Sequence, residues 1–348
     1  ASRFGFAFKV LPTIIFVSAL TSLLYYFGIL QRVVFGFAWV MKRLMRLSGA
    51  ESLATAANVF VGQTEAPLVV KPYVAGMTRS ELMALMTGGM ATIAGSVFVL
   101  YITTLGGGDP ATQELVARQL LTASMMNAPA ALLVAKMLVP ESEEIASDLF
   151  VPREKQGRNA LDALAGGTIE GLKLALNVAA MLIVFVAVIA MVNWFLGFVG
   201  GIGGDSGWIN GWIAQLSGGV FPGLSFEALV GFAFAPLAFA IGASPGEVLQ
   251  LGQLLGTKMV SNEFIAYLAL GEMSAANSLS PKTLFLATFA LCGFANFASI
   301  GIQIGGIGAL APERRGDLAS LGMKAMIGGT LASLLTASIA GMFFSLVG

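Results

Sequence analysis

The sequence predicts an all-α integral membrane protein that contains an internal inverted repeat. Of its 348 residues, 57% are hydrophobic and only 11% are charged, whereas soluble domains carry about 25% charged residues. Several apolar segments reach the length of roughly 20 residues that crosses the hydrocarbon core of a bilayer. Two more apolar segments are broken by polar residues near their middles. We therefore expect the lipid bilayer to surround most of the chain.

The composition also excludes several classes of function. The formal net charge is +0, which gives no reason to expect a nucleic-acid partner. The chain has no histidine, so the commonest general base and metal ligand is missing. Cys292 is the only cysteine, so no intrachain disulfide can form. We predict that the protein is not an enzyme; the alternative is an intramembrane enzyme that uses Glu65 and Glu263 as acid and base.

The membrane spans that we expect are apolar runs of sufficient length, at about 6–30, 82–104, 115–139, 170–200, 283–310 and 322–347. Their orientation follows from Lys and Arg, which gather in 31–50, 140–167 and 311–317. The connecting segments 104–113 and 201–222 contain neither residue type. Because cytoplasmic loops carry an excess of Lys and Arg, we place the three basic segments in the cytoplasm and the other two outside.

Segments 50–75 and 245–270 do not fit this scheme, because each is apolar overall but polar at its centre. The first contains Gly62-Gln63-Thr64-Glu65 and the second contains Ser261-Asn262-Glu263. Each is long enough to enter the bilayer and return, but too short to cross it twice. We interpret both as re-entrant helical hairpins with polar tips, since non-helical backbone at membrane depth is tolerated only inside protein or along a cavity.

Two further segments are expected to lie along the membrane surface. Residues 31–50 are amphipathic, with basic residues set between apolar ones, as in helices that lie in the interface. Residues 225–243 are expected to form an apolar helix at the outer interface. We expect Pro236 to interrupt that helix, because proline removes a backbone donor.

The order of these elements suggests a repeat. Span, surface helix, hairpin, span and span occur at 6–139 and again at 170–347, with opposite orientation. Residues 88–95 (GGMATIAG) align with 292–299 (CGFANFAS), with three identical residues in eight positions. Inverted repeats with broken helices near the midplane are the architecture of secondary transporters, whose substrate site lies where the repeats meet. The expected fold is therefore an inverted-repeat transporter with two re-entrant hairpins and interfacial helices.

Glu65 and Glu263 lie inside apolar segments, where a charge costs about 2.5–3.5 kcal/mol on insertion scales. One explanation is structural: each carboxylate is satisfied by Lys71, by Lys258 or by hairpin amides. The explanation that we favour is that both face one polar cavity. Helix ends at hairpin tips leave free N–H groups, which favour anionic or hydroxyl-bearing ligands, and free carbonyls, which favour cations.

Neutral oxygens near the first hairpin indicate a cation site. Asn58, the Val61 carbonyl and the Thr92-Ile93 pair offer amide, carbonyl and hydroxyl oxygens, which are the ligands that small hard cations such as Na⁺ prefer. Thr92 has an alternative role, because a helical threonine usually bonds the carbonyl one turn back.

A second polar group lies near the end of the chain. Asn296 and Ser299 are three residues apart and therefore share one helix face, and Phe294 and Phe297 flank them. This pattern suits a ligand with hydroxyls and a flat ring, although aromatic residues at helical spacing are more often simple packing.

Three regions of the sequence resemble the signatures of the concentrative nucleoside transporter family. They are GQTEAPLVV with the preceding AANVFV, then SNEFIAY, and then CGFAN with a following serine. The resemblance runs over essentially the whole chain and is strongest to bacterial members. It implies that this chain lacks the first two membrane spans of the family.

The resemblance also implies roles for individual residues. The nucleobase would contact Gln63, Thr64 and Glu65 at a tip kept open by Gly62, with apolar contacts from Val97 and Leu176. The ribose would contact Glu263, Phe294, Asn296 and Ser299. The Na⁺ ion would lie between Asn58, Val61, Thr92 and Ile93, where Thr92 replaces the serine of bacterial members and keeps its hydroxyl.

The same resemblance divides the chain into scaffold and transport parts. Residues 1–49 would be a scaffold span with an interfacial helix, 50–139 the first repeat of the transport domain and 140–167 a cytoplasmic linker. Residues 168–223 would be a scaffold span with an outer loop, and 224–348 an outer interfacial helix with the second repeat.

The function that we expect is import of nucleosides, uridine-like and purine, by Na⁺ symport with an elevator-type movement. The protein would be a homotrimer in a bacterial inner membrane. The alternative is a proton-coupled symporter of the same fold, with Glu65 or Glu263 carrying the proton.

Overall fold

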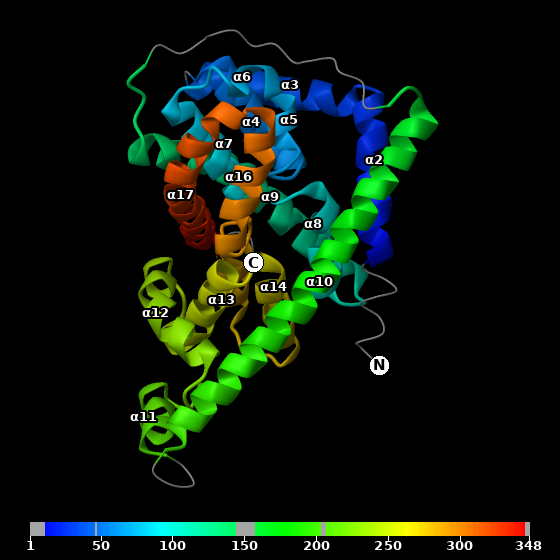
Figure 1. The fold of residues 1–348 in the computed structure, drawn as a ribbon. Coiled ribbons are helices and arrows are strands. Elements are labelled where there is room, and N and C mark those ends of the chain that lie inside the picture. Colours follow the sequence, from blue (N-terminus) through cyan, green and yellow to red (C-terminus); the bar gives the residue numbers. More distant parts are fainter. Residues whose placement is uncertain (1–10, 46, 144–156, 203–206, 345–348) are drawn as a thin grey trace. The chain divides into compact units, whose positions relative to one another are not determined.

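The computed structural model describes residues 11–45, 47–143, 157–202 and 207–344, and every regular element in those ranges is a helix (Figure 1). The chain forms two compact units. One comprises Ala1–Asn177 with Cys292–Thr336, and the other comprises Val178–Leu291 with Ala337–Gly348. Each unit is described by itself. The all-helical class predicted from the sequence is confirmed.

The first unit contains the first hairpin and the helices that pack around it. Here α4 packs against α3, α7 and α9, and α8 packs against α2 and α9. The N-terminal part of α10 (Ala160–Gly200) and most of α17 (Arg315–Met342) also belong to this unit. Its other helices are α2 (Leu11–Tyr26), α3 (Ile29–Met45), α4 (Gly49–Phe60), α5 (Ala66–Val69), α6 (Lys71–Val74), α7 (Arg79–Ala91), α8 (Gly95–Gly106), α9 (Pro110–Leu138) and α16 (Phe297–Leu310).

The second unit contains the second hairpin. Helix α13 packs against α12, α14 and α15. The remainder of α10 and the end of α17 complete the unit. Its other helices are α11 (Trp208–Leu216), α12 (Phe226–Ala240), α13 (Val248–Val260), α14 (Glu263–Ala275) and α15 (Pro281–Ala290).

Each expected hairpin consists of two helical arms joined at a polar tip. In the first, α4 begins with a capping box in which Ser48 and Glu51 bond each other's backbone N–H groups, and it ends before Gly62. In the second, α13 ends at Val260, and the Asn262 side chain accepts the Ile265 N–H at 2.9 Å to start α14. In the second hairpin the polar tip residues therefore end one arm and begin the next, whereas in the first α4 ends at Val61 and Glu65 precedes α5 without a side-chain cap.

Two of the expected spans are not continuous helices. The stretch 82–104 is split into α7 and α8, with Thr92 ending one and Ala94 beginning the other. The stretch 283–310 is split into α15 and α16, where the Asn296 side chain caps α16 by accepting the Ser299 N–H at 2.9 Å. Hydropathy cannot detect these breaks, because most of the intervening residues are apolar and the N-cap is a single side chain.

The described residues therefore contain fewer span-length helices than we expected. Three are long and apolar enough to cross a membrane: Pro110–Leu138, Ile183–Gly200 and Pro312–Met342. A fourth is counted if α2 and α3 are taken together, although a bend of 77° separates them. That bend agrees with a span followed by a surface helix. Residues 6–10 of the first expected span lie outside the described residues.

The expectation that Pro236 interrupts its helix is wrong. Helix α12 runs through Pro236 without a break. Proline removes only its own N–H donor, and helices in membranes tolerate this loss because neighbouring groups satisfy the freed carbonyl.

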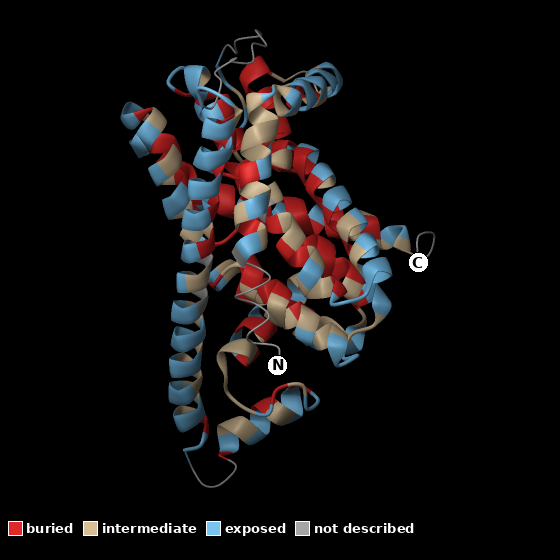
Figure 2. Ribbon diagram, turned by 90° about the vertical axis from the view of Figure 1, so that its right-hand side faces the viewer, coloured by how far each residue is buried: buried red, intermediate tan, exposed pale blue. Residues whose placement is uncertain are grey.

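Within α10, the stretch Ile183–Gly200 is strongly apolar, yet only Gly200 in it is buried and the other residues are exposed or half-buried (Figure 2). An apolar helix surface of this kind is typical of contact with lipid or with another protein. The linker preceding α10 is described only in part, since residues 144–156 lie outside the described residues.

A group of charged and polar side chains ties the first hairpin to α9. The Lys136 ammonium pairs with Glu51, which is 1% exposed on α4, and with Glu141 at 3.2 Å. The Thr78 hydroxyl donates to Glu141 at 2.9 Å. Burial raises the pKa of the Glu141 carboxyl, but the hydrogen bonds from Thr78, the Glu143 N–H and Lys136 outweigh burial and hold that pKa below its ordinary value.

Candidate functional site

A hydrogen bond between a side chain and the backbone closes the tip of the first hairpin. The Gly62 N–H donates to Glu65 Oε2 at 2.9 Å, so the carboxylate closes the tip between α4 and α5. The same arrangement leaves Thr64 and Glu65 exposed while Gln63 is buried. The side chains of the tip therefore have two different environments: Thr64 and Glu65 are exposed, and Gln63 is buried.

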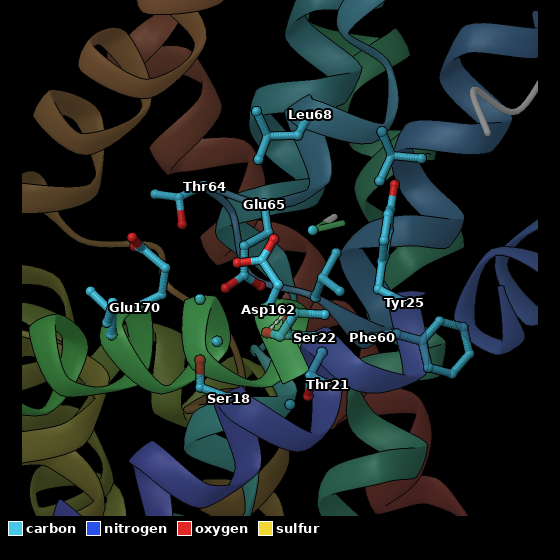
Figure 3. Close-up of a pocket in the computed structure, with 18 residues that line it drawn as sticks. Ser18, Thr21, Ser22, Tyr25, Phe60, Thr64, Glu65, Leu68, Asp162 and Glu170 are labelled. Carbon is cyan, nitrogen blue, oxygen red and sulfur yellow. Dashed lines mark hydrogen bonds between the residues drawn. The ribbon is translucent and has the colours of Figure 1, made fainter. Parts of the chain in front are cut away.

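Thr64 and Glu65 line a cavity of about 550 Å³ within the first unit (Figure 3). The opposite wall comes from α2 and α10. It is rich in hydroxyl and carboxylate groups, contributed by Ser18, Thr21, Ser22, Tyr25, Asp162 and Glu170. Such a cavity has the size and polarity for a small polar molecule.

Gln63 lies on the other side of the tip, in a network of amides. Its Nε2 donates to Ser299 Oγ at 3.0 Å, and its Oε1 accepts from Gln303 Nε2 at 3.1 Å. Gln303 also donates to the Met86 carbonyl at 3.0 Å. The network joins the hairpin tip to α16 and α7, although Gln63 and Ser299 are 236 positions apart.

Glycine on α7 makes room for this network. A Cβ at Gly89 would lie 2.7 Å from Gln303 Nε2 and 3.1 Å from Gln63 Cβ, closer than side chains tolerate. Gln303 did not emerge from the sequence. The only signal was one polar residue within the apolar run IGIQIGG, where an amide has to find buried partners.

The Asn58 side chain is buried, and among the described residues it lacks a hydrogen-bond partner. Its side chain is 1% exposed, and neither its Oδ1 nor its Nδ2 has a partner among the described residues. Its amide lies close to α7, since a Cβ at Gly88 would be 3.1 Å from Asn58 Nδ2. Leaving a buried polar group unpaired costs about 1–3 kcal/mol, so an enclosed, unpaired amide indicates a place for a ligand.

The backbone beside Asn58 is that of two helix ends. A Cβ at Gly62 would lie 3.1 Å from Ala94 Cβ, and a Cβ at Gly95 would lie 3.0 Å from the Phe60 carbonyl. The end of α4 and the break between α7 and α8 are therefore adjacent. The segment that contains Asn58 and Val61 thus ends beside the break that contains Thr92 and Ile93, the four residues predicted for the cation site.

The Thr92 hydroxyl has a bond within its own helix. It donates to the Gly88 carbonyl at 2.9 Å, which is the alternative role considered from the sequence. A hydroxyl has one hydrogen and two lone pairs, so this bond uses the hydrogen and leaves the oxygen able to accept or to coordinate. Both roles of Thr92 are compatible with the geometry.

Glu263 lies in the second unit, at the first position of α14, and is buried at 6% exposure. A carboxylate is favoured there by the partial positive charge of the helix N-terminus. Nearby on α13, the Lys258 ammonium donates to the Ala290 carbonyl at 3.0 Å, at the end of α15.

The remaining predicted site residues have less defined surroundings. Val97 is buried on α8, Phe294 is half-buried in the segment before α16, and Asn296 caps that helix. Leu176 is 60% exposed on α10 and does not line the cavity that contains Glu65.

Span-length helices, helix–tip–helix hairpins and helices broken beside buried polar groups together define a class, the helical membrane transporters. A family model described as Na+ dependent nucleoside transporter C-terminus matches residues 119–341, and one described as Nucleoside recognition matches residues 7–108. The chain belongs to the concentrative nucleoside transporter family. The resemblance found in the sequence is confirmed.

Individual relatives agree with this assignment. A Haemophilus influenzae protein named "Uncharacterized transporter" is 46% identical, over 99% of this chain and 78% of that one. The rat "Sodium/nucleoside cotransporter 1" is 39% identical, over 97% of this chain and 51% of that one. A solved structure, "Structure of CNTnw in an inward-facing substrate-bound state", matches with a TM-score of 0.86 and 42% identity, over 99% of this chain and 76% of that one.

Proposed function

We propose that the protein imports nucleosides by symport with Na⁺, across a bacterial inner membrane. The observation that carries the proposal is the buried Asn58 amide, unpaired and adjacent to the break between α7 and α8. The name of the rat relative, a sodium/nucleoside cotransporter, supports the same pair of substrates.

The residues at the break fit a small hard cation. Asn58 would offer Oδ1, Thr92 its hydroxyl oxygen, and Val61 and Ile93 their carbonyls at helix ends, where helical partners are missing. These four oxygens are neutral. They suit Na⁺ better than a proton, because a proton carrier needs a group that titrates and neither an amide, a hydroxyl nor a carbonyl does so.

For the nucleoside we propose the contacts that the family resemblance implies. We assign the base to Gly62, Gln63, Thr64 and Glu65, with Val97 and Leu176 as apolar contacts. We assign the ribose to Glu263, Phe294, Asn296 and Ser299. The hydrogen bond from Gln63 to Ser299 supports a site in which base-contacting and sugar-contacting residues lie side by side.

The transport movement follows from the proposed division of the chain. Residues 50–139 and 224–348 would carry the substrate, while 1–49 and 168–223 would form the scaffold, joined by the linker 140–167. The exposed apolar face of Ile183–Gly200 supports a scaffold role, since that face needs lipid or a neighbouring subunit. We propose a homotrimer and an elevator-type movement of the substrate-carrying part.

Uptake in membrane vesicles tests the coupling ion. Radiolabelled uridine uptake is measured with an inward Na⁺ gradient at fixed pH, and separately with an inward proton gradient without Na⁺. Uptake driven by Na⁺ alone is expected. Uptake driven by the proton gradient alone would replace this proposal with the proton-coupled alternative, in which Glu65 or Glu263 is the carrier.

A further inference from the structure

Asn127 on α9 is fully buried and binds two separate stretches of backbone. Its exposure is 0%. Its Nδ2 donates to the Ala91 carbonyl at 2.7 Å and to the Cys292 carbonyl at 3.1 Å. A primary amide has two hydrogens, so one side chain supplies one hydrogen to each carbonyl.

Both carbonyls belong to interruptions in helical backbone. Ala91 is the last residue of α7, and Cys292 follows the end of α15. The last carbonyls of a helix have no amide partner within it, and at membrane depth water does not replace that partner. Asn127 therefore donates a hydrogen bond to one carbonyl in each interruption.

The orientation of the Asn127 amide is fixed from its other end. The Thr336 hydroxyl, on α17, donates to Asn127 Oδ1. This contact keeps Oδ1 away from the two carbonyls and the NH₂ group toward them. An inverted amide would place oxygen against oxygen, which is repulsive.

The two interruptions also touch each other directly. Gly293 adopts φ +119°, a conformation that favours glycine. A Cβ at this position would collide with the Ala91 carbonyl. The two stretches therefore pack backbone against backbone, with Asn127 bonded to both.

Each carbonyl lies within two residues of a proposed site. Ala91 precedes Thr92 and Ile93 of the cation site, and Cys292 leads into Phe294 and Asn296 of the ribose site. A shift in one peptide changes the position of the Asn127 NH₂ group, and so changes the hydrogen bond to the other. We propose that Asn127 is a positioning residue that couples Na⁺ binding to nucleoside binding, an inference that rests on the proposed function.

Other side chains at this position would not reproduce the contact. Leucine has a similar size but no donor, and an aspartate carboxylate has no hydrogen to donate when ionised. Glutamine keeps the amide but is longer by one methylene, and extra methylenes in a buried site displace the polar atoms. The proposal therefore depends on the asparagine side chain itself.

The test measures how strongly Na⁺ and uridine stabilise one another's binding. The uridine Kd of the purified protein is determined by calorimetry without Na⁺ and at saturating Na⁺, and the ratio of the two values is the coupling factor. Coupled sites typically show factors of about 5 to 150. Asn127→Leu is expected to bring the coupling factor close to 1, because leucine has no donor and the two carbonyls are then no longer linked by one side chain.

A matched control is Ser124→Ala, one turn earlier on α9. Ser124 is 2% exposed and its hydroxyl has no partner among the described residues, so this change should keep the parent's coupling factor. If Asn127 served stability alone, Asn127→Leu would lower the melting temperature but leave the factor unchanged in the folded protein. That result overturns the proposal, as does an equal loss of coupling in Ser124→Ala.

Thr336→Val decides the matter if Asn127→Leu does not fold. This variant keeps Asn127 but removes the donor to its Oδ1, and we expect the coupling factor to fall at least about threefold. An unchanged factor would overturn the proposal.

A parent protein whose uridine Kd does not depend on Na⁺ would instead refute the proposed symport and this inference with it. Na⁺ dependence in the parent with unchanged variants would refute only the role of Asn127.

Discussion

The Thr92 hydroxyl and the Glu263 carboxylate show how much depends on single side chains. Thr92 bonds its own helix and can still offer its oxygen to an ion. Glu263 begins a helix and is buried. In both cases the observed surroundings explain why the residue is tolerated in an apolar chain, and substitution separates that local role from ligand binding.

Thr92→Val keeps the shape of the side chain and removes its oxygen. If Thr92 is a ligand, the Na⁺ concentration for half-maximal uptake should rise at least about fivefold, since one ligand contact is worth about 1 kcal/mol or more. Nucleoside affinity should fall at low Na⁺ and recover at high Na⁺, because linkage is reciprocal. An unchanged Na⁺ dependence would show that the hydroxyl serves only the Gly88 carbonyl.

Glu263→Gln keeps the shape and removes the charge. Hydrogen bonds from ribose hydroxyls to a carboxylate are worth about 1.5–3 kcal/mol, so uridine binding should weaken by at least about tenfold. The measurement is the uridine Kd of a variant that still melts cooperatively. The loss should be smaller for a nucleoside that lacks one ribose hydroxyl, and an equal loss for both would contradict the ribose assignment.

At the scale of helices, the first hairpin depends on the ion pairs that Lys136 makes with Glu51 and Glu141. Because Glu51 is 1% exposed, removal of its partner leaves a buried charge without compensation, which costs about 3–5 kcal/mol in buried pairs. The pKa of Glu141 lies below its ordinary value, so its share of the stability is present at neutral pH and is lost as the pH falls through that lowered value.

Lys136→Met should therefore lower the melting temperature strongly, whereas Lys136→Met combined with Glu51→Gln should recover much of the loss. The measurement is a double-mutant cycle by thermal melting in detergent. Lys173→Met serves as a control, because Lys173 pairs with Glu170 on the surface of one helix, where both side chains are more than 60% exposed. Equal destabilisation by Lys136→Met and Lys173→Met would contradict the anchoring role.

The elements also show what the sequence could and could not predict. Hydropathy and polar tips predicted the helical class and both hairpins, because backbone groups in lipid must bond within the protein and helices achieve this. The breaks after α7 and α15 were missed because they depend on partners distant in sequence, such as Asn127. Asn58 and Thr92 could be proposed from their own chemistry, whereas Gln303 could not, because its role depends on contacts with Gln63 and Met86.

For the molecule as a whole, the predicted orientation in the membrane follows from the distribution of Lys and Arg. The segments 104–113 and 311–317 should lie on opposite sides. Ala111 and Glu313 represent these segments because both are exposed.

Ala111→Cys and Glu313→Cys, each introduced into a Cys292→Ala background, should react from opposite sides with a membrane-impermeant maleimide. In intact cells only Ala111→Cys is expected to be labelled, and Glu313→Cys should become reactive after the membrane is opened. Labelling of both in intact cells would contradict the inverted arrangement of the two halves.

The only thiol in the chain belongs to Cys292, which is 0% exposed and whose carbonyl is held by Asn127. A thiol in this position can react only when the surrounding helices separate, so its alkylation rate reports the frequency of local opening. The parent protein thus carries its own kinetic probe. A ligand that makes local opening around Cys292 rarer should slow its reaction with N-ethylmaleimide. Alkylation rates measured with Na⁺, with uridine and with both together would show which ligand suppresses this opening.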